Sequence, residues 1–119
     1  MQVFPLALLN TSIITTDGFY SLTTITLSEA QAYVRYATDG SYEYNLSGVD
    51  SAIGHESTAL IMSELLGIEI PVNRQQFSQQ VNQLALVFKL KGRPPEGAVL
   101  NREQIENIGY EFKILNRSL

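Results

Sequence analysis

Several residue types are absent or scarce in this chain. It has no cysteine and no tryptophan, and it has a single histidine, His55. The absence of cysteine excludes disulfides, thiolate nucleophiles and cysteine-based zinc or iron–sulfur sites. One histidine cannot complete a zinc site either, so we expect neither a metal ion nor another cofactor. A chain without cysteine also suits a reducing compartment.

Charge is scarce as well, and it has an acidic excess. Charged residues make up 17% of the chain, and 12 acidic against 8 basic residues give a formal net charge of −4. A domain of this sign does not attract long DNA or RNA through its overall field, whereas a small anionic ligand needs only a few local donors. We therefore expect no long nucleic acid among its partners.

Long apolar runs are also missing. Residues 1–15 are apolar but carry no basic segment. No run approaches the roughly 18 residues that indicate a membrane helix. We therefore expect no signal peptide, no transmembrane span and no membrane partner. The expected location is the cytoplasm, or the host cytoplasm if the protein is viral.

The patterning that is present predicts one α/β (α+β) domain over residues 1–119. Apolar runs and period-2 alternation predict strands, and 3.6-residue periodicity with start and stop signals predicts helices. The expected strands are 3–10, 20–27, 68–72, 83–90 and 110–115, and the expected helices are 28–37, 55–66 and 102–108. Residues 38–50 are expected to form a loop with room for one short strand. Together these elements predict a mixed central sheet of about five strands flanked by helices.

Local signals refine this prediction. Pro5 indicates either a sheet edge or an irregular strand start, because proline cannot donate to a ladder. Ser28 and Gln31 form an expected capping box, Gly67 is expected to end the second helix, and Asn101 is expected to cap the third. The near-continuous apolar run 83–90 indicates burial on both faces, and hence a central strand.

The stretch AIGHEST (52–58) carries the single histidine at the start of a predicted helix. Gly54 and His55 are expected beside the unpaired backbone N–H groups of the first turn. With the hydroxyls of Ser57 and Thr58 nearby, this corner could bind an anion. An imidazole beside a bound phosphate can transfer a proton near neutral pH. The alternative is that His55 or a neighbour only caps the helix.

Two arginines follow predicted strands. Arg93 and Glu96 belong to GRPPEG (92–97), a loop stiffened by two prolines, where a guanidinium can clamp a phosphate bidentately. The alternative is a structural hairpin loop with an exposed ion pair. Arg74 follows the expected strand at 68–72, at a sheet end where α/β proteins often bind ligands. Its alternative is an ordinary solvated side chain.

Three consecutive hydrogen-bonding side chains leave the first strand. They are Asn10, Thr11 and Ser12. They could read the base or sugar of a nucleotide, or they could close a turn.

Familiar catalytic motifs are missing. There is no G-x-S-x-G elbow for a Ser-His-Asp triad, no P-loop and no G-x-G-x-x-G. The remaining set of one histidine, arginines, a glutamate and small hydroxyls matches phosphodiester cleavage without metal. In that reaction a ribose 2′-OH attacks its own phosphate, an arginine offsets the developing charge, and histidine protonates the leaving 5′-oxygen.

Longer segments resemble a known family. LLNTS, SAIGHESTALIMSELLG, PVNR and LVFKLKGRPPEGAVLNREQIENIGYEF occur in this order. Together they resemble the small viral anti-CRISPR ring nucleases that act on type III CRISPR systems, and their bacterial relatives. The resemblance covers nearly the whole chain and is strongest over 51–112. Its most specific motifs are I-G-H-[DE]-S-T, N-R and R-x-x-E-G.

The resemblance implies a homodimeric α/β enzyme of host–virus interaction. Such proteins bind cyclic tetra-adenylate, the second messenger of type III CRISPR systems, and cut it to linear di-adenylates without metal. His55 then matches the general acid, and Arg93 and Glu96 match the residues of the R-x-x-E-G loop that lie at the catalytic site. By the resemblance together with the chemistry above, the residues expected to hold the ring are Asn10, Thr11, Ser12, Gly54, Ser57, Thr58 and Arg74.

A dimer would also solve the problem of a single histidine. A ring of four nucleotides can lie on a two-fold axis, so that each chain supplies one His55 and two cuts give equal halves. Two alternatives stay open. One is a protein that sequesters a cyclic oligonucleotide without cutting it, and the other is a regulatory protein whose pocket is unused.

Overall fold

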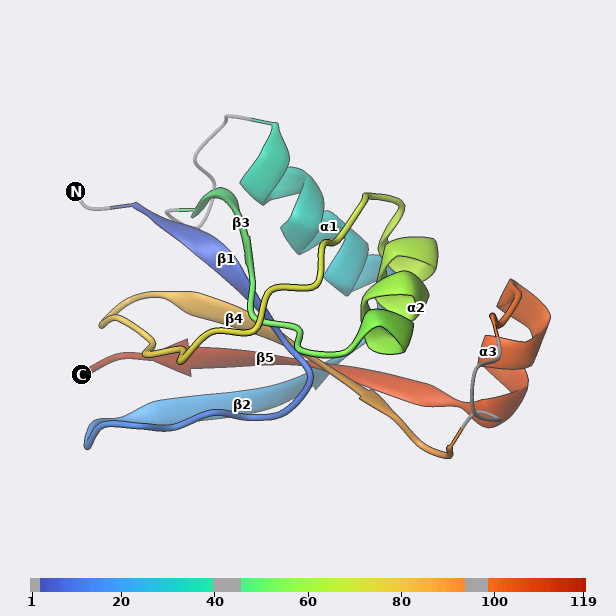
Figure 1. Cartoon of the computed structure of the whole chain (residues 1–119). Helices are drawn as coiled ribbons and strands as arrows, with labels where there is room; N and C mark the ends of the chain where they lie inside the picture. The colour runs from blue at the N-terminus through green and yellow to red at the C-terminus, as the bar shows by residue number, and fades with distance from the viewer. Residues whose placement is uncertain (1–2, 40–45, 94–98) are drawn as a thin grey trace.

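The computed structural model describes residues 3–39, 46–93 and 99–119. They form five strands and three helices in the order ββαβαβαβ (Figure 1). The elements are β1 (Phe4–Leu9), β2 (Tyr20–Ile25), α1 (Leu27–Thr38), β3 (Leu46–Ser51), α2 (Glu56–Leu66), β4 (Leu84–Leu90), α3 (Arg102–Ile108) and β5 (Tyr110–Arg117).

All five strands join one mixed sheet in the order β2-β5-β4-β1-β3, which confirms the predicted fold class. Strands β4, β1 and β3 run parallel, while β5 is antiparallel to both β4 and β2. The middle position of β4 was predicted from its apolar run. Leu86 and Phe88 are buried on one face of the sheet, and Ala85 and Val87 are buried on the other.

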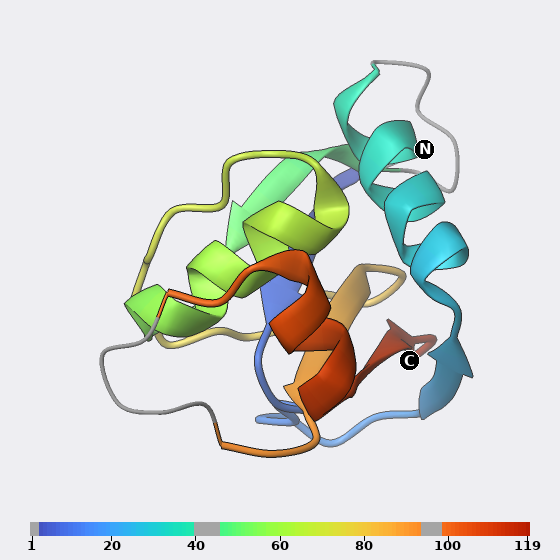
Figure 2. The ribbon, with the colours of Figure 1, turned by 90° about the vertical axis from the view of Figure 1, so that its right-hand side faces the viewer.

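The helices lie on one side of the sheet. α1 and α2 cover that face, and α3 lies beside α2 beyond the ends of β4 and β5 (Figures 1 and 2). The larger core fills the space between sheet and helices, and in it the rings of Phe88 and Phe112 have centroids 5.1 Å apart. Among the described residues no helix covers the opposite face, where Phe77 packs on the smaller core from the segment between α2 and β4.

Pro5 does not mark a sheet edge, because β1 lies between β4 and β3. The other prediction for Pro5, an irregular start, matches the observed pairing. Phe4 pairs with Leu46 but Leu6 pairs with Val49, so the register shifts across Pro5. The missing N–H of proline thus falls where the ladder is interrupted.

The short strand allowed for in 38–50 exists as β3, whereas the strand expected at 68–72 does not form. In the second segment the carbonyl of Pro71 accepts a 2.7 Å hydrogen bond from the Ser51 hydroxyl. A side chain therefore takes a backbone group that a ladder would use, and Pro71 has no N–H to donate to one. The alternation of apolar and polar residues in 68–72 thus wrongly predicted a strand.

The first helix begins at a different capping box from the one expected. Thr26 is the N-cap of α1: its hydroxyl accepts from the N–H of Glu29 at 3.1 Å, and the Glu29 carboxylate accepts from the N–H of Thr26 at 3.0 Å. The prediction of Ser28 with Gln31 was wrong, because β2 ends just before Thr26 and the chain turns helical there. Gln31 instead donates to the carbonyl of Leu65 at 3.0 Å and so ties α1 to α2.

The other two helix ends follow their predicted signals. Gly67 ends α2 in the left-handed region, with φ at 74°. Asn101 begins α3 in a capping box with Gln104, and both of its hydrogen bonds are 2.9 Å long. In the part of the chain that the structure describes, no helix is long and apolar enough to cross a membrane.

Candidate functional site

Three of the predicted site segments follow the carboxyl ends of three parallel strands. Asn10–Ser12 follow β1, His55 follows β3, and Arg93 follows β4. Because β1 lies between β3 and β4 and is parallel to both, these positions follow neighbouring strand ends. In open α/β sheets, ligands bind in the crevice outside the carboxyl ends of the strands. The structure therefore places the separate sequence motifs at the edge where a ligand is expected.

His55 is the N-cap residue of α2, but its side chain takes no part in capping. The backbone is extended, with φ at −127° and ψ at 131°, and its carbonyl accepts from the N–H of Ala59 at 3.1 Å. The side chain is exposed, as is that of Ser57, while Thr58 is half-buried. Capping by the imidazole is thus excluded, and the ring is left available beside the N–H groups of the first turn.

Arg74 lies directly against the residue before His55. Its Nε donates a 2.8 Å hydrogen bond to the carbonyl of Gly54. A Cβ added at Gly54 would lie 3.1 Å from Cγ of Arg74, so the arginine side chain lies close along the glycine. The Arg74 side chain is exposed to solvent, as its alternative predicted, but its Nε is anchored at the residue that precedes His55.

The neighbour of Arg74 fixes this segment to the end of β3. The backbone N–H of Asn73 donates to the carbonyl of Ile53 at 2.8 Å, and its side-chain amide donates to the carbonyl of Ser51 at 2.8 Å. Asn73 was not among the predicted site residues, although the N-R pair contained it. Its part is structural: it holds the loop that carries Arg74 against the strand that leads into His55.

Of the two site residues predicted in the loop 92–97, the structure describes only Arg93. Arg93 is exposed and lies three residues after the end of β4. Glu96 belongs to 94–98 and falls outside the described residues, so its place at the catalytic site stays a prediction, and the alternative of an ion pair with Arg93 stays open. Within the described residues, no group of three or more side chains of the types that bind metals lies together.

The segment after β1 lines a small cavity on the helix-free face. Asn10, Thr11 and Ser12 border a space of about 180 Å³ together with Lys89 and Lys113. His55, Arg74 and Arg93 do not line it. The sequence analysis did not select these two lysines as site residues, because Lys89 lies within a predominantly apolar predicted strand. The alternation of β4 would have placed it on the same face as Val87.

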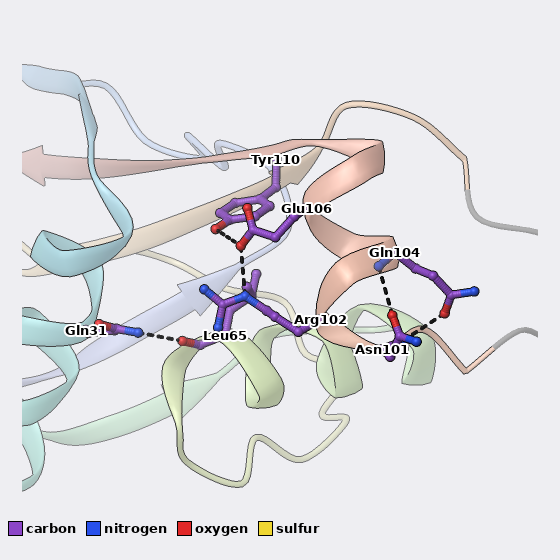
Figure 3. A network of polar contacts seen from close by, with 7 residues as sticks. All are labelled: Gln31, Leu65, Asn101, Arg102, Gln104, Glu106 and Tyr110. Carbon is purple, nitrogen blue, oxygen red and sulfur yellow. Dashed lines mark hydrogen bonds and ion pairs between the residues drawn. The ribbon is translucent and has the colours of Figure 1, made fainter.

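A second polar cluster joins α3 to β5 (Figure 3). The carboxylate of Glu106 accepts from Nε of Arg102 at 2.8 Å and from the hydroxyl of Tyr110 at 2.9 Å. The bond from Arg102, followed by that from Tyr110, lowers the pKa of Glu106. Burial first, and then the Glu106 carboxylate, raise the pKa of Tyr110. These contacts fix α3 beside the loop that carries Arg93 and involve none of the predicted site residues.

Comparison with known proteins places this fold and sequence in a family. A profile described as STIV B116-like matches residues 6–112. The chain belongs to the STIV B116-like family. The match spans all three strand ends of the candidate site and includes His55, Arg74 and Arg93.

Members related to this STIV B116-like chain occur in a bacterium and in viruses. The protein YddF of Bacillus subtilis (strain 168) is 38% identical over 112 residues, which cover 94% of this chain and 96% of YddF. ORF117 of Acidianus two-tailed virus is 38% identical over 68 residues, or 56% of this chain and 58% of the viral protein. The solved structure of B116 from Sulfolobus turreted icosahedral virus superposes with a TM-score of 0.75 at 20% identity, covering 98% of this chain and 99% of that chain. At that identity the last comparison shows a shared fold.

Proposed function

We propose that this STIV B116-like protein is a metal-independent ring nuclease. It binds cyclic tetra-adenylate at a homodimer interface and cleaves it to linear di-adenylates, which switches off type III CRISPR signalling. The observation that carries the proposal is the position of the exposed His55, next to the Arg74-anchored Gly54, at the sheet edge shared with Asn10–Ser12 and Arg93.

The proposed cleavage reaction needs few groups besides these side chains. The 2′-oxygen of a ribose bonds to the adjacent phosphorus, the bond from phosphorus to the 5′-oxygen breaks, and the 2′-hydroxyl proton passes to solvent. His55 gives its proton to the leaving 5′-oxygen. Arg93 offsets the charge that develops on the phosphate. Glu96 is assigned to the catalytic site because it matches the glutamate of the R-x-x-E-G loop. The first-turn N–H groups of α2, with Ser57 and Thr58, hold a phosphate oxygen near the imidazole.

A dimer supplies what one chain lacks. One chain contains one histidine, whereas cutting a ring of four into two equal halves needs two acids. A two-fold axis through the ring presents His55 from each protomer to opposite phosphodiesters. The viral relatives fit evasion of host defence, and the bacterial relative fits controlled shutdown of the same signal.

The direct test is incubation with cyclic tetra-adenylate in the presence of EDTA, followed by chromatography of the products. We expect wild-type protein to produce linear di-adenylates. His55→Ala should retain binding but lose cleavage by at least about a hundredfold, the size expected of a general acid. Cleavage by this variant at the wild-type rate would show that the acid has been wrongly assigned. A parallel incubation with cyclic tri- and hexa-adenylate tests the preference for ring size.

A second candidate function is sequestration of the ring without cleavage. It is favoured by one observation: among the described residues, no side chain or carbonyl makes a hydrogen bond to the imidazole of His55. Catalytic histidines are commonly oriented by such a partner. Recovery of intact ring from a tight complex after long incubation would support sequestration, and linear fragments would reject it. A regulatory protein with an unused pocket would show no thermal stabilisation by any cyclic oligoadenylate.

A further inference from the structure

The helix-free face of the sheet carries two lysines that the reaction proposed above does not use. Along β4, Phe88 packs under the helices and Val87 packs on the opposite face, so Lys89 shares the face of Val87. On β5, Phe112 belongs to the helix-side core, so Lys113 points to the other face as well. Both lysines therefore stand on the same side of the sheet.

The register makes these lysines close neighbours. Lys89 pairs with Glu111 across the antiparallel ladder, which makes Lys113 the diagonal neighbour of Lys89, about 7–8 Å away between α-carbons. Nζ of Lys113 is 3.6 Å from Oε1 of Glu111, and the two side chains are 32% and 31% exposed. Lys89 is exposed and forms no ion pair with another described residue. Two ammonium groups thus face a single carboxylate.

The cavity beside them adds neutral hydrogen-bonding groups. Both lysines and Glu111 line the space of about 180 Å³ together with Asn10, Thr11 and Ser12. None of these three side chains makes a hydrogen bond to another residue in the described parts of the chain. Ammonium, hydroxyl and amide groups can all donate hydrogen bonds, and two ammonium groups against the one carboxylate of Glu111 leave an excess of positive charge that suits an oxyanion. The local charge is opposite to the net charge of −4 of the whole chain.

We propose that this cavity is a phosphate subsite, in which Lys89 and Lys113 hold a non-scissile phosphodiester of the cyclic oligonucleotide. This inference rests on the proposed function. Because β1 separates β4 from β3, the cavity lies about two strand spacings, roughly 10 Å, from the strand end that leads into His55. One phosphate of the ring can therefore occupy the cavity while another lies at the imidazole. The lysines bind the ring and touch no reacting atom.

The test compares single and double variants, Lys89→Gln and Lys113→Gln, with Arg35→Gln as a charge-matched control. Arg35 is exposed on α1, on the other side of the sheet. Affinity for cyclic tetra-adenylate is measured by calorimetry at several salt concentrations with each variant in the His55→Ala background, which should bind the ring without cutting it, and cleavage at saturating ring is measured with His55 in place. Thermal melts monitored by circular dichroism verify that each variant is folded.

We expect each lysine variant to weaken binding about five- to tenfold at low salt. The slope of log affinity against log salt should become shallower by about 0.7 for each lysine, as for loss of one phosphate contact on a single strand. The turnover rate at saturating ring should stay within about threefold of wild type, because the lysines do not act on the scissile bond. Arg35→Gln should change neither affinity nor slope.

Two other outcomes would each decide a different question. If the wild-type protein binds and cuts the ring while the double lysine variant matches Arg35→Gln in affinity and salt slope, the subsite is wrong and the proposed function stands. If the wild-type protein binds no cyclic tetra-adenylate, the proposed function fails, and this inference fails with it.

Discussion

Nε of Arg74 donates a 2.8 Å hydrogen bond to the carbonyl of Gly54, the residue that precedes His55. The bond links the loop after α2 to the loop before it. The absence of a side chain at Gly54 lets the arginine approach so closely, since a Cβ there would lie 3.1 Å from Cγ of Arg74. The position of the arginine side chain along the residue that precedes His55 thus depends on Gly54 and Arg74 together.

Arg74→Ala should lower kcat/KM for cleavage of cyclic tetra-adenylate by about tenfold or more. The variant loses a cation beside the proposed phosphate site and a charged hydrogen bond worth about 1.5–3 kcal/mol, and about 1.4 kcal/mol corresponds to a factor of ten. Arg74→Lys keeps the charge but lacks the Nε donor, and should recover only part of the loss. Steady-state kinetics with both variants measures the effect. Equal activity of Arg74→Ala and wild type would remove Arg74 from the site.

Gly67→Ala should destabilise the fold by about 1 kcal/mol without changing ring cleavage. Gly67 has φ at 74°, where alanine is strained, yet a Cβ there would meet no atom within 4 Å. The cost is therefore conformational and not steric. Urea unfolding should show a lower midpoint with an unchanged m-value. Gly67→Asn is the control, because asparagine tolerates this region better, and an equal loss for both residues would contradict the explanation.

Glu106→Gln should lower the melting temperature slightly at neutral pH and have no effect in strong acid. The pKa of Glu106 is lowered from its ordinary value of 4.5, first by the hydrogen bond from Arg102 and then by that from Tyr110. A group with a lowered folded pKa stabilises the protein above its unfolded pKa and loses this contribution as pH falls through the folded value. The effect is small, because the pair with Arg102 is solvent-exposed.

Melting curves of wild type and Glu106→Gln from pH 7 down to pH 2 measure this difference. The two curves should converge in acid, because protonation removes the same charge as the substitution. The exposed Glu69, which has no ion pair among the described residues, provides the control Glu69→Gln. A constant difference between wild type and Glu106→Gln across the whole pH range would show that the charge of Glu106 is not the cause.

Much of the local structure could be predicted from the sequence. The near-continuous apolar run of β4 predicted a central strand, because only a strand covered on both faces gains from such a run. Gly67 and Asn101 predicted a helix end and a helix start, since each satisfies backbone groups within a few residues. The motifs around His55, Arg74 and Arg93 could be located in the sequence, because consecutive or closely spaced polar residues after apolar runs are local signals, while their role at a ligand site stays a prediction.

Other features depended on distant partners. The choice of Thr26 over Ser28 as helix start was set by where β2 leaves its ladder with β5. β3 is a strand because β1 lies parallel beside it. The segment 68–72 has a stronger alternating pattern but forms no strand, because side-chain hydroxyls bind its backbone groups instead.

By itself the sequence determined the fold class, the approximate positions of most helices and strands, and which motifs carry the candidate site residues, because those follow from local periodicity and motif. Only the tertiary structure decided the strand order, and thereby that the segments carrying Asn10–Ser12, His55 and Arg93 follow three neighbouring parallel strands. It also set Lys89 and Lys113 side by side. The physical reason is that a period of two assigns each side chain to a face, but it does not specify which strand will lie alongside.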